Sequence, residues 1–407
     1  MTAFPRAPGD VITPWLSRML SVLRGRGLEV EVLAPSYRGL ASSQWEGVPV
    51  HRFRYAPARL ETLTHDETVP DRLRRSPAYA ALLPSYLLGG VLTAFRLGRN
   101  GRDVVHVHWP MPHALFGAAL RRASGGKTAL VCSYYSVELS WVDRRLPWLR
   151  PYLRWSARTA DGVTAISSAT AARVRELAGR EVPVIPFSSA LEDGDWNGRG
   201  EPFSDSGPIR LLFVGRLVER KGVEVLLRAL SLVLERREAQ LTIVGAGEWE
   251  SKLREVARET GVEDRVRFLG FIPEAQLQDQ YAACDIFVLP AVVDRKGDTE
   301  GLGVVLLEAL RFARPVIASA VGGIPDIVRQ GETGWLVPPN DSRALANRIL
   351  LVASNPSRAR RVGSQGKALA ERRFSWAGIA DRLIGVYERA ILERSGHGGP
   401  RSGGSEA

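Results

Sequence analysis

The chain has 407 residues, of which 45% are hydrophobic and 24% charged, so it is neither fibrous nor disordered and can build about two globular domains. Its net charge of +11 is carried almost wholly by arginine, but no zinc-finger, helix-turn-helix or basic aromatic RNA-binding pattern accompanies it, so nucleic acid is not an expected partner. Residues 1–10 lack the apolar segment of a secretory signal, and Cys132 and Cys284 lie in apolar runs that predict buried thiols, which indicates the cytoplasm.

The first half of the chain alternates strand-like and helical stretches. Strands are predicted at 28–34, 48–53, 103–108, 128–133, 162–166 and 182–186, and helices at 12–25, 78–98, 112–123, 147–159 and 168–178. This alternation predicts a mainly parallel, doubly wound sheet in an N-terminal domain of residues 1–190. The opening stretch, residues 4–10, has the composition of the loop after a first, central strand. We therefore expect that strand to be truncated and the natural protein to begin upstream of Met1.

Two segments of this half combine arginine with apolar side chains. Residues 78–95 carry no charge, and their flanks hold Arg72, Arg74, Arg75, Arg96 and Arg99. Residues 144–158 contain five arginines together with Trp148, Tyr152 and Trp155. Pro84 and the pair Gly89-Gly90 argue against a membrane span, whereas basic residues interleaved with aromatic ones are typical of a membrane interface. We expect peripheral association with an anionic membrane surface, and a surface helix with one buried face is the alternative.

A Gly-rich linker at 191–208 precedes a second alternating unit. Its strands are predicted at 209–215, 240–245, 265–270, 285–290, 315–319 and 334–337, and its helices at 222–237, 248–260, 274–283, 303–313 and 341–353. This pattern predicts a second parallel sheet in a domain of residues 209–375. A helix at 376–394 is expected to reach back to the first domain, and the Gly- and Ser-rich residues 395–407 are expected to be disordered.

Candidate ligand-binding residues recur at the predicted carboxyl ends of these strands, where open α/β sheets bind ligands. Arg216 and Lys221 follow strand 209–215 and can neutralise a diphosphate and the charge that grows on it as it leaves. Glu300 and Glu308 flank a Gly-Leu-Gly turn and the start of a helix, whose free N–H groups suit a phosphate. The two carboxylates can bind hydroxyls on either side of that phosphate, so the pattern favours a nucleotide sugar. Other turns at strand ends lie at Gly245, Gly247, Phe271 and Ile272.

The second half closely resembles the family 4 glycosyltransferases, which are retaining enzymes of the GT-B fold with two Rossmann-like domains. The resemblance rests on residues 213–222, 244–247, 268–273, 300–308 and 322–326, and more loosely on 4–10, 105–109 and 164–168 of the first half. It implies that the α/β chain forms two doubly wound domains facing a cleft.

The resemblance also implies roles for individual residues. Arg216 and Lys221 would bind the donor diphosphate, Glu300 would hold hydroxyls of the transferred sugar, and these three are the expected catalytic residues. Glu308 would hold the ribose. The remaining donor contacts are expected at Gly9, Gly245, Gly247, Phe271, Ile272, Gly301, Leu302, Gly303 and Val304.

One turn departs from the family pattern. The family commonly places a histidine, facing the sugar, in a His-Gly-x-Glu/Asp turn after the fourth strand, and here that turn reads Tyr135-Ser136-Val137-Glu138. Tyrosine donates hydrogen bonds but is a poor base near neutral pH because its pKa is about 10. We expect His108, Tyr135 and Glu138 to contact the acceptor or the sugar.

These observations predict a retaining transfer of a sugar from a nucleotide-diphosphate sugar to a glycan or lipid-linked acceptor, as in polysaccharide or glycolipid synthesis. No cofactor or metal is expected, because Asp193-Gly194-Asp195, which has a metal-binding form, lies in the linker. A GT-B epimerase or phosphorylase, or a donor-binding protein without turnover, remains the alternative.

Overall fold

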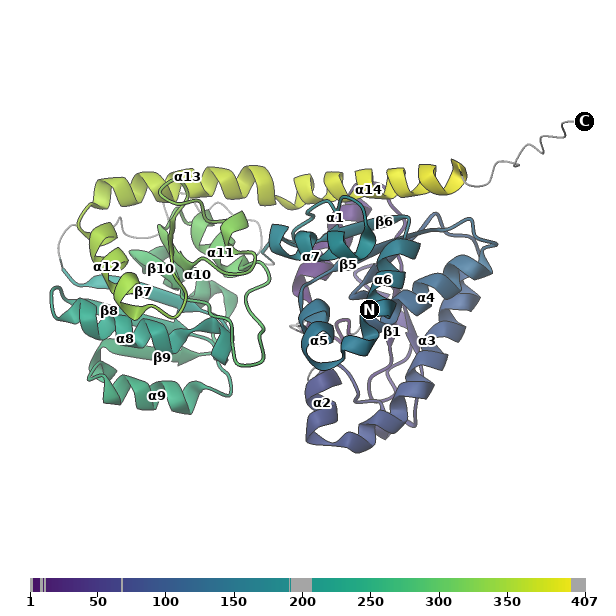
Figure 1. Cartoon of the computed structure of the whole chain (residues 1–407), viewed down its shortest axis with the longest axis horizontal. Helices are drawn as coiled ribbons and strands as arrows, with labels where there is room; N and C mark the ends of the chain where they lie inside the picture. The colour runs from purple at the N-terminus through teal and green to yellow at the C-terminus, as the bar shows by residue number, and fades with distance from the viewer. Residues whose placement is uncertain are drawn as a thin grey trace, which may run out of the picture. The chain divides into compact units, whose positions relative to one another are not determined.

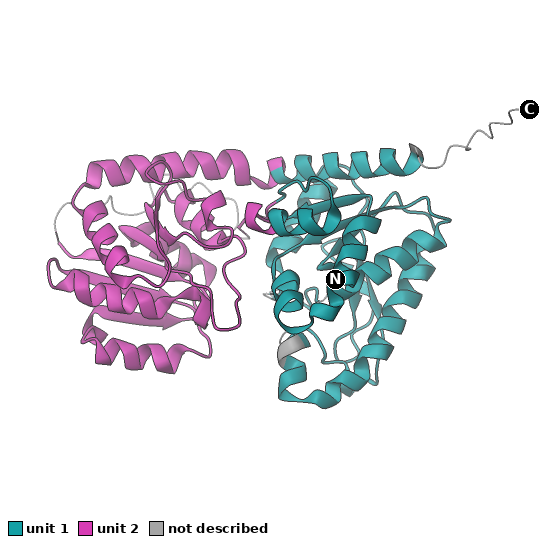
Figure 2. Cartoon of the chain, in the orientation of Figure 1, with its two compact units in different colours: residues 1–165, 171–185, 379–407 teal, residues 166–170, 186–378 magenta. Residues whose placement is uncertain are grey.

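The computed structural model describes residues 3–7, 10, 12–66, 69–189, 191 and 207–396 of the chain. These residues form two compact α/β units (Figure 2). Unit 1 contains residues 1–165, 171–185 and 379–407, and unit 2 contains residues 166–170 and 186–378. The chain therefore passes from unit 1 to unit 2 near residue 185 and returns near residue 378.

Unit 1 holds two short sheets, one mixed and one parallel, together with helices (Figure 1). Its strands are β1 (Val32–Pro35), β2 (Ser43–Trp45), β3 (Val48–Phe53), β4 (Val104–His108), β5 (Ala129–Tyr134) and β6 (Gly162–Ala165). Its helices are α1 (Pro14–Gly25), α2 (Val69–Arg75), α3 (Leu83–Gly98), α4 (Pro110–Ala123), α5 (Val137–Arg145), α6 (Arg150–Thr159) and, shared with unit 2, α7 (Ser168–Ala178).

The strand order of unit 1 differs in one respect from the single sheet that the sequence predicts. One sheet has the order β1-β3-β2, in which β2 runs antiparallel, and the other has the order β4-β5-β6. Within the described ranges no strand pairs with both β1 and β4. The strand predicted at 182–186 is reduced to one bridge between Ala165 and Val184, because Pro183 and Pro186 lack the N–H groups that a ladder needs.

The last helix, α14 (Trp376–Gly396), belongs to unit 1 from Ile379 onward. Val386 and Ala390 of α14 form a small core cluster with Ala129 and Val131 of β5. The C-terminal helix therefore covers the β4-β5-β6 sheet.

Unit 2 is built on one six-stranded parallel sheet with the order β12-β11-β10-β7-β8-β9. Its strands are β7 (Ile209–Val214), β8 (Ala239–Val244), β9 (Val266–Gly270), β10 (Ile286–Leu289), β11 (Val316–Ser319) and β12 (Trp335–Val337). The central strands are mostly apolar because helices bury both of their faces. These helices are α8 (Val223–Leu234), α9 (Glu250–Glu259), α10 (Glu274–Ala283), α11 (Val304–Arg311), α12 (Ser342–Ala353) and α13 (Pro356–Phe374).

The two-domain organisation agrees with the sequence, but its boundaries shift. The N-terminal part of unit 1 ends at residue 185 rather than 190, and residues 166–170 within it pack with unit 2. Most of the predicted linker, including Asp193-Gly194-Asp195, and the tail from residue 397 lie outside the described residues. Both cysteines are buried and free, as predicted.

Candidate active site

The segment that carries Lys221 is fixed by close contact between two loops of unit 2. Lys221 ends a short 3-10 helix and is followed by Gly222, which has a φ of 67°. A Cβ at Gly222 would lie 1.9 Å from the carbonyl oxygen of Pro290, so only glycine allows this approach. The Val292 N–H also donates to the carbonyl of Arg220 at 2.9 Å. These contacts hold Lys221 at the carboxyl ends of β7 and β10.

Lys221 and Glu300 form a buried ion pair in unit 2. The Lys221 Nζ lies 2.5 Å from Glu300 Oε2, and both residues are 8% exposed. Arg220 Nη1 lies 3.3 Å from the same oxygen. Burial acts to raise the pKa of Glu300, but the charges of Lys221 and Arg220 outweigh it and the pKa is lowered. Burial lowers the pKa of Lys221, and the Glu300 carboxylate opposes this shift.

This cluster brings together two of the three predicted catalytic residues and adds one that the sequence reasoning missed. The missed residue is Arg220, which directly precedes Lys221. Its charge alone does not distinguish it, in the sequence, from arginines whose side chains lie in solvent. Arg216 lies exposed after β7, and its charge contributes to lowering the Lys221 pKa. The cluster thus presents several cations around one carboxylate, which suits a diphosphate beside a hydroxylated sugar.

The loop that carries Glu300 packs against a second glycine-rich loop. A Cβ at Gly322 would lie 1.9 Å from the carbonyl oxygen of Glu300, and the Gly323 N–H donates to that carbonyl at 3.1 Å. The Leu302 N–H hydrogen-bonds the Glu300 carboxylate, so this amide orients the side chain rather than a phosphate. Gly303, with a φ of 90°, is the N-cap residue just before α11, and the amides of the first turn remain the predicted phosphate contact.

Glu308 lies on α11, half-buried, and its carboxylate accepts hydrogen bonds from Tyr281 and Ser189. Burial raises its pKa, and these two hydrogen bonds act in the opposite direction. The sequence motifs pointed to Glu308 but not to its two partners, which come from distant segments of the chain.

The glycines after β8 have a packing role that the sequence did not reveal. A Cβ at Gly245 would lie 2.0 Å from the carbonyl of Gly215, and one at Gly247 would lie 2.3 Å from that of Leu217. The Gly245 N–H donates to the carbonyl of Gly270 at 2.8 Å, so it is not available to a ligand. These glycines let the loops after β7 and β8 lie against each other, and a direct donor contact by Gly247 stays a prediction.

Phe271 follows β9, an edge strand of the unit 2 sheet, and its side chain is 79% exposed. An exposed ring at a strand end can stack on a nucleotide base, a contact worth about 1–3 kcal/mol per base. We expect Phe271→Ala to weaken nucleotide binding about 5- to 150-fold and to leave thermal stability unchanged. Titration calorimetry measures this, with Leu392→Ala, another exposed apolar residue, as the control. Equal affinity of both variants and the parent would contradict a base contact at Phe271.

In unit 1 the structure brings the three other predicted contact residues together. The Tyr135 hydroxyl and His108 Nδ1 lie 2.5 Å apart, and the Tyr135 N–H donates to Glu138 Oε1 at 2.7 Å. Burial lowers the pKa of His108 and raises that of Tyr135, so both are neutral near pH 7. Burial also raises the pKa of Glu138 to about 7, and its Oε2 has no hydrogen-bond partner among the described residues.

Two tryptophans that the sequence reasoning passed over complete this cluster. The rings of Trp109 and Tyr135 are 4.6 Å apart, and Trp15 lies 5.6 Å from Tyr135. Trp109 has a φ of 53° and Ser136 one of 79°, values that non-glycine residues adopt only at a cost of about 1–3 kcal/mol each. Such strain at the carboxyl ends of β4 and β5 is typical of a functional site.

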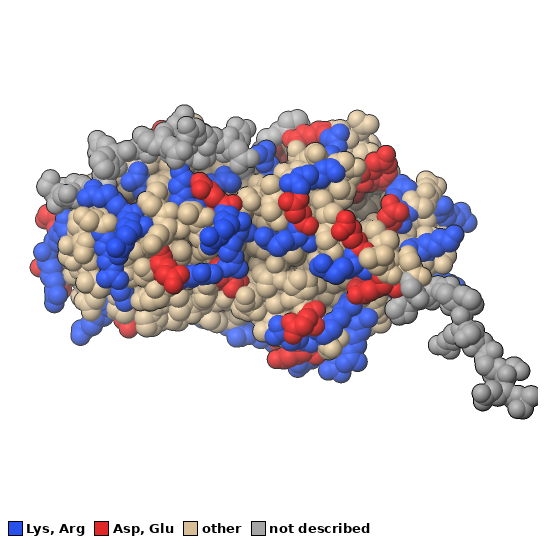
Figure 3. All heavy atoms as spheres, turned by 90° about the horizontal axis from the view of Figure 1, so that it is seen from above, with Lys and Arg blue, Asp and Glu red and all other residues tan. Residues whose placement is uncertain are grey.

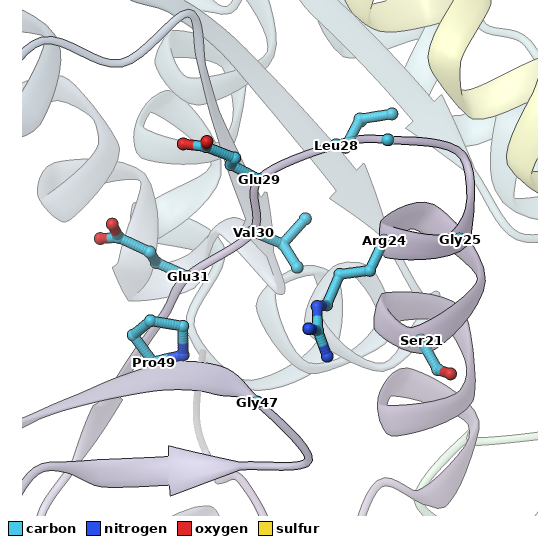
Figure 4. A pocket seen from close by; sticks show the side chains of 10 residues that line it. Ser21, Arg24, Gly25, Leu28, Glu29, Val30, Glu31, Gly47 and Pro49 are labelled. Carbon is cyan, nitrogen blue, oxygen red and sulfur yellow. The ribbon is translucent and has the colours of Figure 1, made fainter.

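A separate cavity of about 640 Å³ lies at the amino end of β1, near the end of α1 (Figure 4). Its charged lining residues are Arg24, Glu29 and Glu31. Glu31 is paired there with Arg102 and His51. None of the predicted site residues lines this cavity.

Two remaining predictions are not settled by the geometry. The described part of the chain contains no group of three His, Cys, Asp or Glu side chains placed to hold a metal ion. Gly9 lies outside the described residues.

Comparison with known proteins decides the family. Residues 195–369 match the family model of glycosyl transferases group 1, and residues 13–188 match that of the glycosyl transferase 4-like domain. The chain is 34% identical over 289 residues to the GDP-mannose-dependent monoacylated α-(1-6)-phosphatidylinositol monomannoside mannosyltransferase of Corynebacterium glutamicum, covering 68% of this chain and 74% of the relative. The chain is a family 4 glycosyltransferase.

Two further comparisons cover nearly the whole of this glycosyltransferase. It is 30% identical over 403 residues to the phosphatidyl-myo-inositol mannosyltransferase of Mycobacterium leprae, covering 95% of each chain. The solved structure of sucrose-phosphate synthase from Thermosynechococcus elongatus superposes with a TM-score of 0.71 at 23% identity over 93% of each chain. The GT-B fold expected from the sequence is thereby confirmed.

Proposed function

We propose that this glycosyltransferase moves a mannosyl residue from GDP-mannose to an inositol-containing lipid acceptor, with retention at the anomeric carbon. The names of the two relatives given above support the donor and the acceptor. The observation that carries the proposal within the chain is the buried Lys221–Glu300 pair with Arg220 beside it. It supplies cations for a leaving diphosphate and a carboxylate for sugar hydroxyls at one place.

The proposed chemistry follows from the charges of this cluster. The bond between the anomeric carbon and the diphosphate oxygen breaks, and Lys221 and Arg216 stabilise the charge that develops on the diphosphate. Glu300 is held in an ion pair, which disfavours attack by its carboxylate and favours its role as acceptor for sugar hydroxyls. The acceptor oxygen then bonds to the anomeric carbon on the face that the diphosphate leaves, and its proton passes to the departing diphosphate.

The direct test uses purified full-length protein with GDP-mannose, UDP-glucose or UDP-galactose and vesicles that contain phosphatidylinositol. We expect a mannolipid from GDP-mannose alone, with an α-linkage seen by NMR. Transfer from a UDP-sugar only would overturn the proposal of GDP-mannose as the donor. A β-linked product would overturn the proposed retention, and transfer only to a soluble glycan would overturn the proposed lipid acceptor.

The exposed surface of unit 1 supports a membrane-bound acceptor. The helical segment Pro77–Gly98 is long and apolar enough to cross a membrane, yet only 17% of its most apolar window is buried. Small residues of α3 face inward, since a Cβ at Gly90 would lie 2.2 Å from the Phe116 ring of α4. Tyr86 is buried on the same face, whereas Leu88, Leu92 and Phe95 point outward and are 59%, 47% and 39% exposed. The helix therefore has one buried face, as the alternative expects, and its exposed apolar face is what supports a contact with lipid.

The charged residues near this helix refine the sequence prediction. Arg96 and Arg99 are exposed at the end of α3, whereas Arg72 is buried against Asp66 and the Tyr79 ring and cannot meet a lipid. In the second predicted segment Trp148 is 71% exposed, but Tyr152 is half-buried and hydrogen-bonds the carbonyl of Pro112. On the face drawn in Figure 3, Lys and Arg are interspersed with Asp and Glu. We propose that the lipid contact is made by α3 with its terminal arginines, together with Trp148.

Replacing Leu88 and Leu92 together by glutamine is expected to weaken vesicle binding at least about 10-fold. The reason is that a leucine fully buried in the lipid contributes about 1.5–3 kcal/mol to binding. Co-sedimentation with vesicles of phosphatidylcholine and phosphatidylglycerol measures this at low and high salt. The control is Leu351→Gln, an equally exposed residue of α12. Vesicle binding that changes with neither the double replacement, nor the salt concentration, nor the anionic lipid content would contradict the proposed lipid contact of α3.

A further inference from the structure

The carboxylate of Glu308 accepts hydrogen bonds from two hydroxyl groups. The Tyr281 hydroxyl donates to Oε2 at 2.7 Å, and Ser189 Oγ donates to Oε1 at 3.0 Å. Tyr281 and Ser189 are both 0% exposed. The two donors therefore engage one oxygen each from inside the protein.

The proton of Ser189 is directed toward Glu308 by the hydrogen bonds around it. The Leu191 N–H donates to Ser189 Oγ at 3.0 Å, so this oxygen already accepts one bond and its own proton is free to donate. The Trp376 indole N–H donates to the carbonyl oxygen of Ser189 at 2.8 Å and fixes the backbone there. Ser189 and Trp376 lie within four residues of the two points where the chain passes between the units.

Packing against neighbouring aromatic rings holds the Tyr281 side chain in place. Its ring stacks on Phe312 with a centroid distance of 5.7 Å and an interplanar angle of 17°, and it lies 5.7 Å from Phe287. The ring cannot turn without opening this core, so the hydroxyl is held against the carboxylate.

We propose that Tyr281 and Ser189 are positioning residues that set Glu308 for the two adjacent hydroxyls of the donor's ribose. An ionised carboxylate has about four lone-pair sites. One bond from Tyr281 and one from Ser189 leave a site on each oxygen, which matches two neighbouring hydroxyls. This inference rests on the proposed function, in which Glu308 binds the nucleotide.

The same two hydrogen bonds favour the ionised form of Glu308. Burial raises the pKa of Glu308, and Glu274 adds to this effect, while Tyr281, Ser189 and Arg311 lower the pKa. Only the ionised carboxylate can accept from both hydroxyls and still accept from both ribose hydroxyls, so nucleotide binding is expected above the pKa of Glu308 and is expected to be lost as the pH falls through it. Removing either hydroxyl raises the pKa and moves that loss to a higher pH.

The test is titration calorimetry of the full chain with GDP and UDP, and the tighter of the two is then used with each variant. Tyr281→Phe keeps the stacked ring and is expected to bind about 10-fold more weakly, since it removes one bond to a charged group. Its binding is also expected to fail at a higher pH than that of the parent. Tyr55→Phe removes the hydroxyl of another buried tyrosine, which accepts the Leu63 N–H, and is expected to change neither property. Against the 2′-deoxynucleotide the effect of Tyr281→Phe should shrink.

The outcomes separate this inference from the function on which it rests. A parent that binds neither nucleotide would overturn the proposed function itself. Unchanged binding by Glu308→Gln would overturn the ribose contact. Weaker binding by Glu308→Gln, together with a Tyr281→Phe variant that keeps the parent's affinity and pH profile, would overturn the positioning role alone.

Discussion

Replacing Lys221 by methionine is expected to lower kcat/KM for sugar transfer by about 10²–10³, a typical loss when one group that stabilises developing charge is removed. The same change is expected to lower the free energy of unfolding by about 3–5 kcal/mol, because it leaves a charge in the protein interior without its closest partner. Lys221 and Glu300 are both 8% exposed, so solvent cannot replace the lost ammonium. Initial rates and urea unfolding measure the two effects.

A double replacement separates stability from catalysis. Lys221→Met combined with Glu300→Gln removes both charges and is expected to recover most of the stability but none of the activity. Lys252→Met serves as the control, since Lys252 is 43% exposed and pairs with Glu224 at the surface, where such pairs contribute at most about 1 kcal/mol. A Lys221→Met enzyme with the parent's rate would show that Lys221 does not act on the leaving group. Parental stability of that variant would show that Arg220 alone neutralises Glu300.

The sequence was sufficient to place Lys221 and Glu300 at strand ends of one parallel sheet, because apolar runs and glycine turns are local signals. It could not show that they neutralise each other. They are 79 positions apart, and their contact depends on how closely the 216–222 and 290–292 loops approach. Tyr281 and Ser189 were missed for the same reason, since a buried tyrosine and a serine just before the predicted linker carry no pattern of their own.

In unit 1 the sequence was a weaker guide. It singled out Tyr135 and Glu138 because their turn departs from the family motif. Trp109 follows a predicted strand, but nothing in the sequence marked it as a site residue. Its positive φ and its contact with Tyr135 are consequences of how β4 and β5 pair, which the alternation of apolar residues does not encode. Likewise, the pattern predicted the strands but not that β1 and β4 would lie in separate sheets.

The other large effect is expected from replacing Gly222 by alanine, and Gly261→Ala is a closely matched control. Gly222 and Gly261 have φ angles of 67° and 66°, so alanine at either position suffers the same left-handed backbone strain of about 1–2 kcal/mol. At Gly261 a Cβ would meet nothing within 4 Å, whereas at Gly222 it would lie 1.9 Å from the carbonyl oxygen of Pro290. Gly261→Ala is therefore expected to cost only the strain, and Gly222→Ala at least about 3 kcal/mol of unfolding free energy, in the range of severe core defects.

The activity of the two variants should diverge further than their stability. The collision at Gly222 must push residues 219–222 away from the 290–292 loop, which moves Lys221 off Glu300. A displacement of about 1 Å can cost a catalytic group about 10²-fold in rate, so Gly222→Ala is expected to lose that much at a temperature where it is still folded. Gly261→Ala should turn over like the parent. Equal rates for both variants would mean that the 216–222 loop adjusts freely, and that the close approach to Pro290 does not position the lysine.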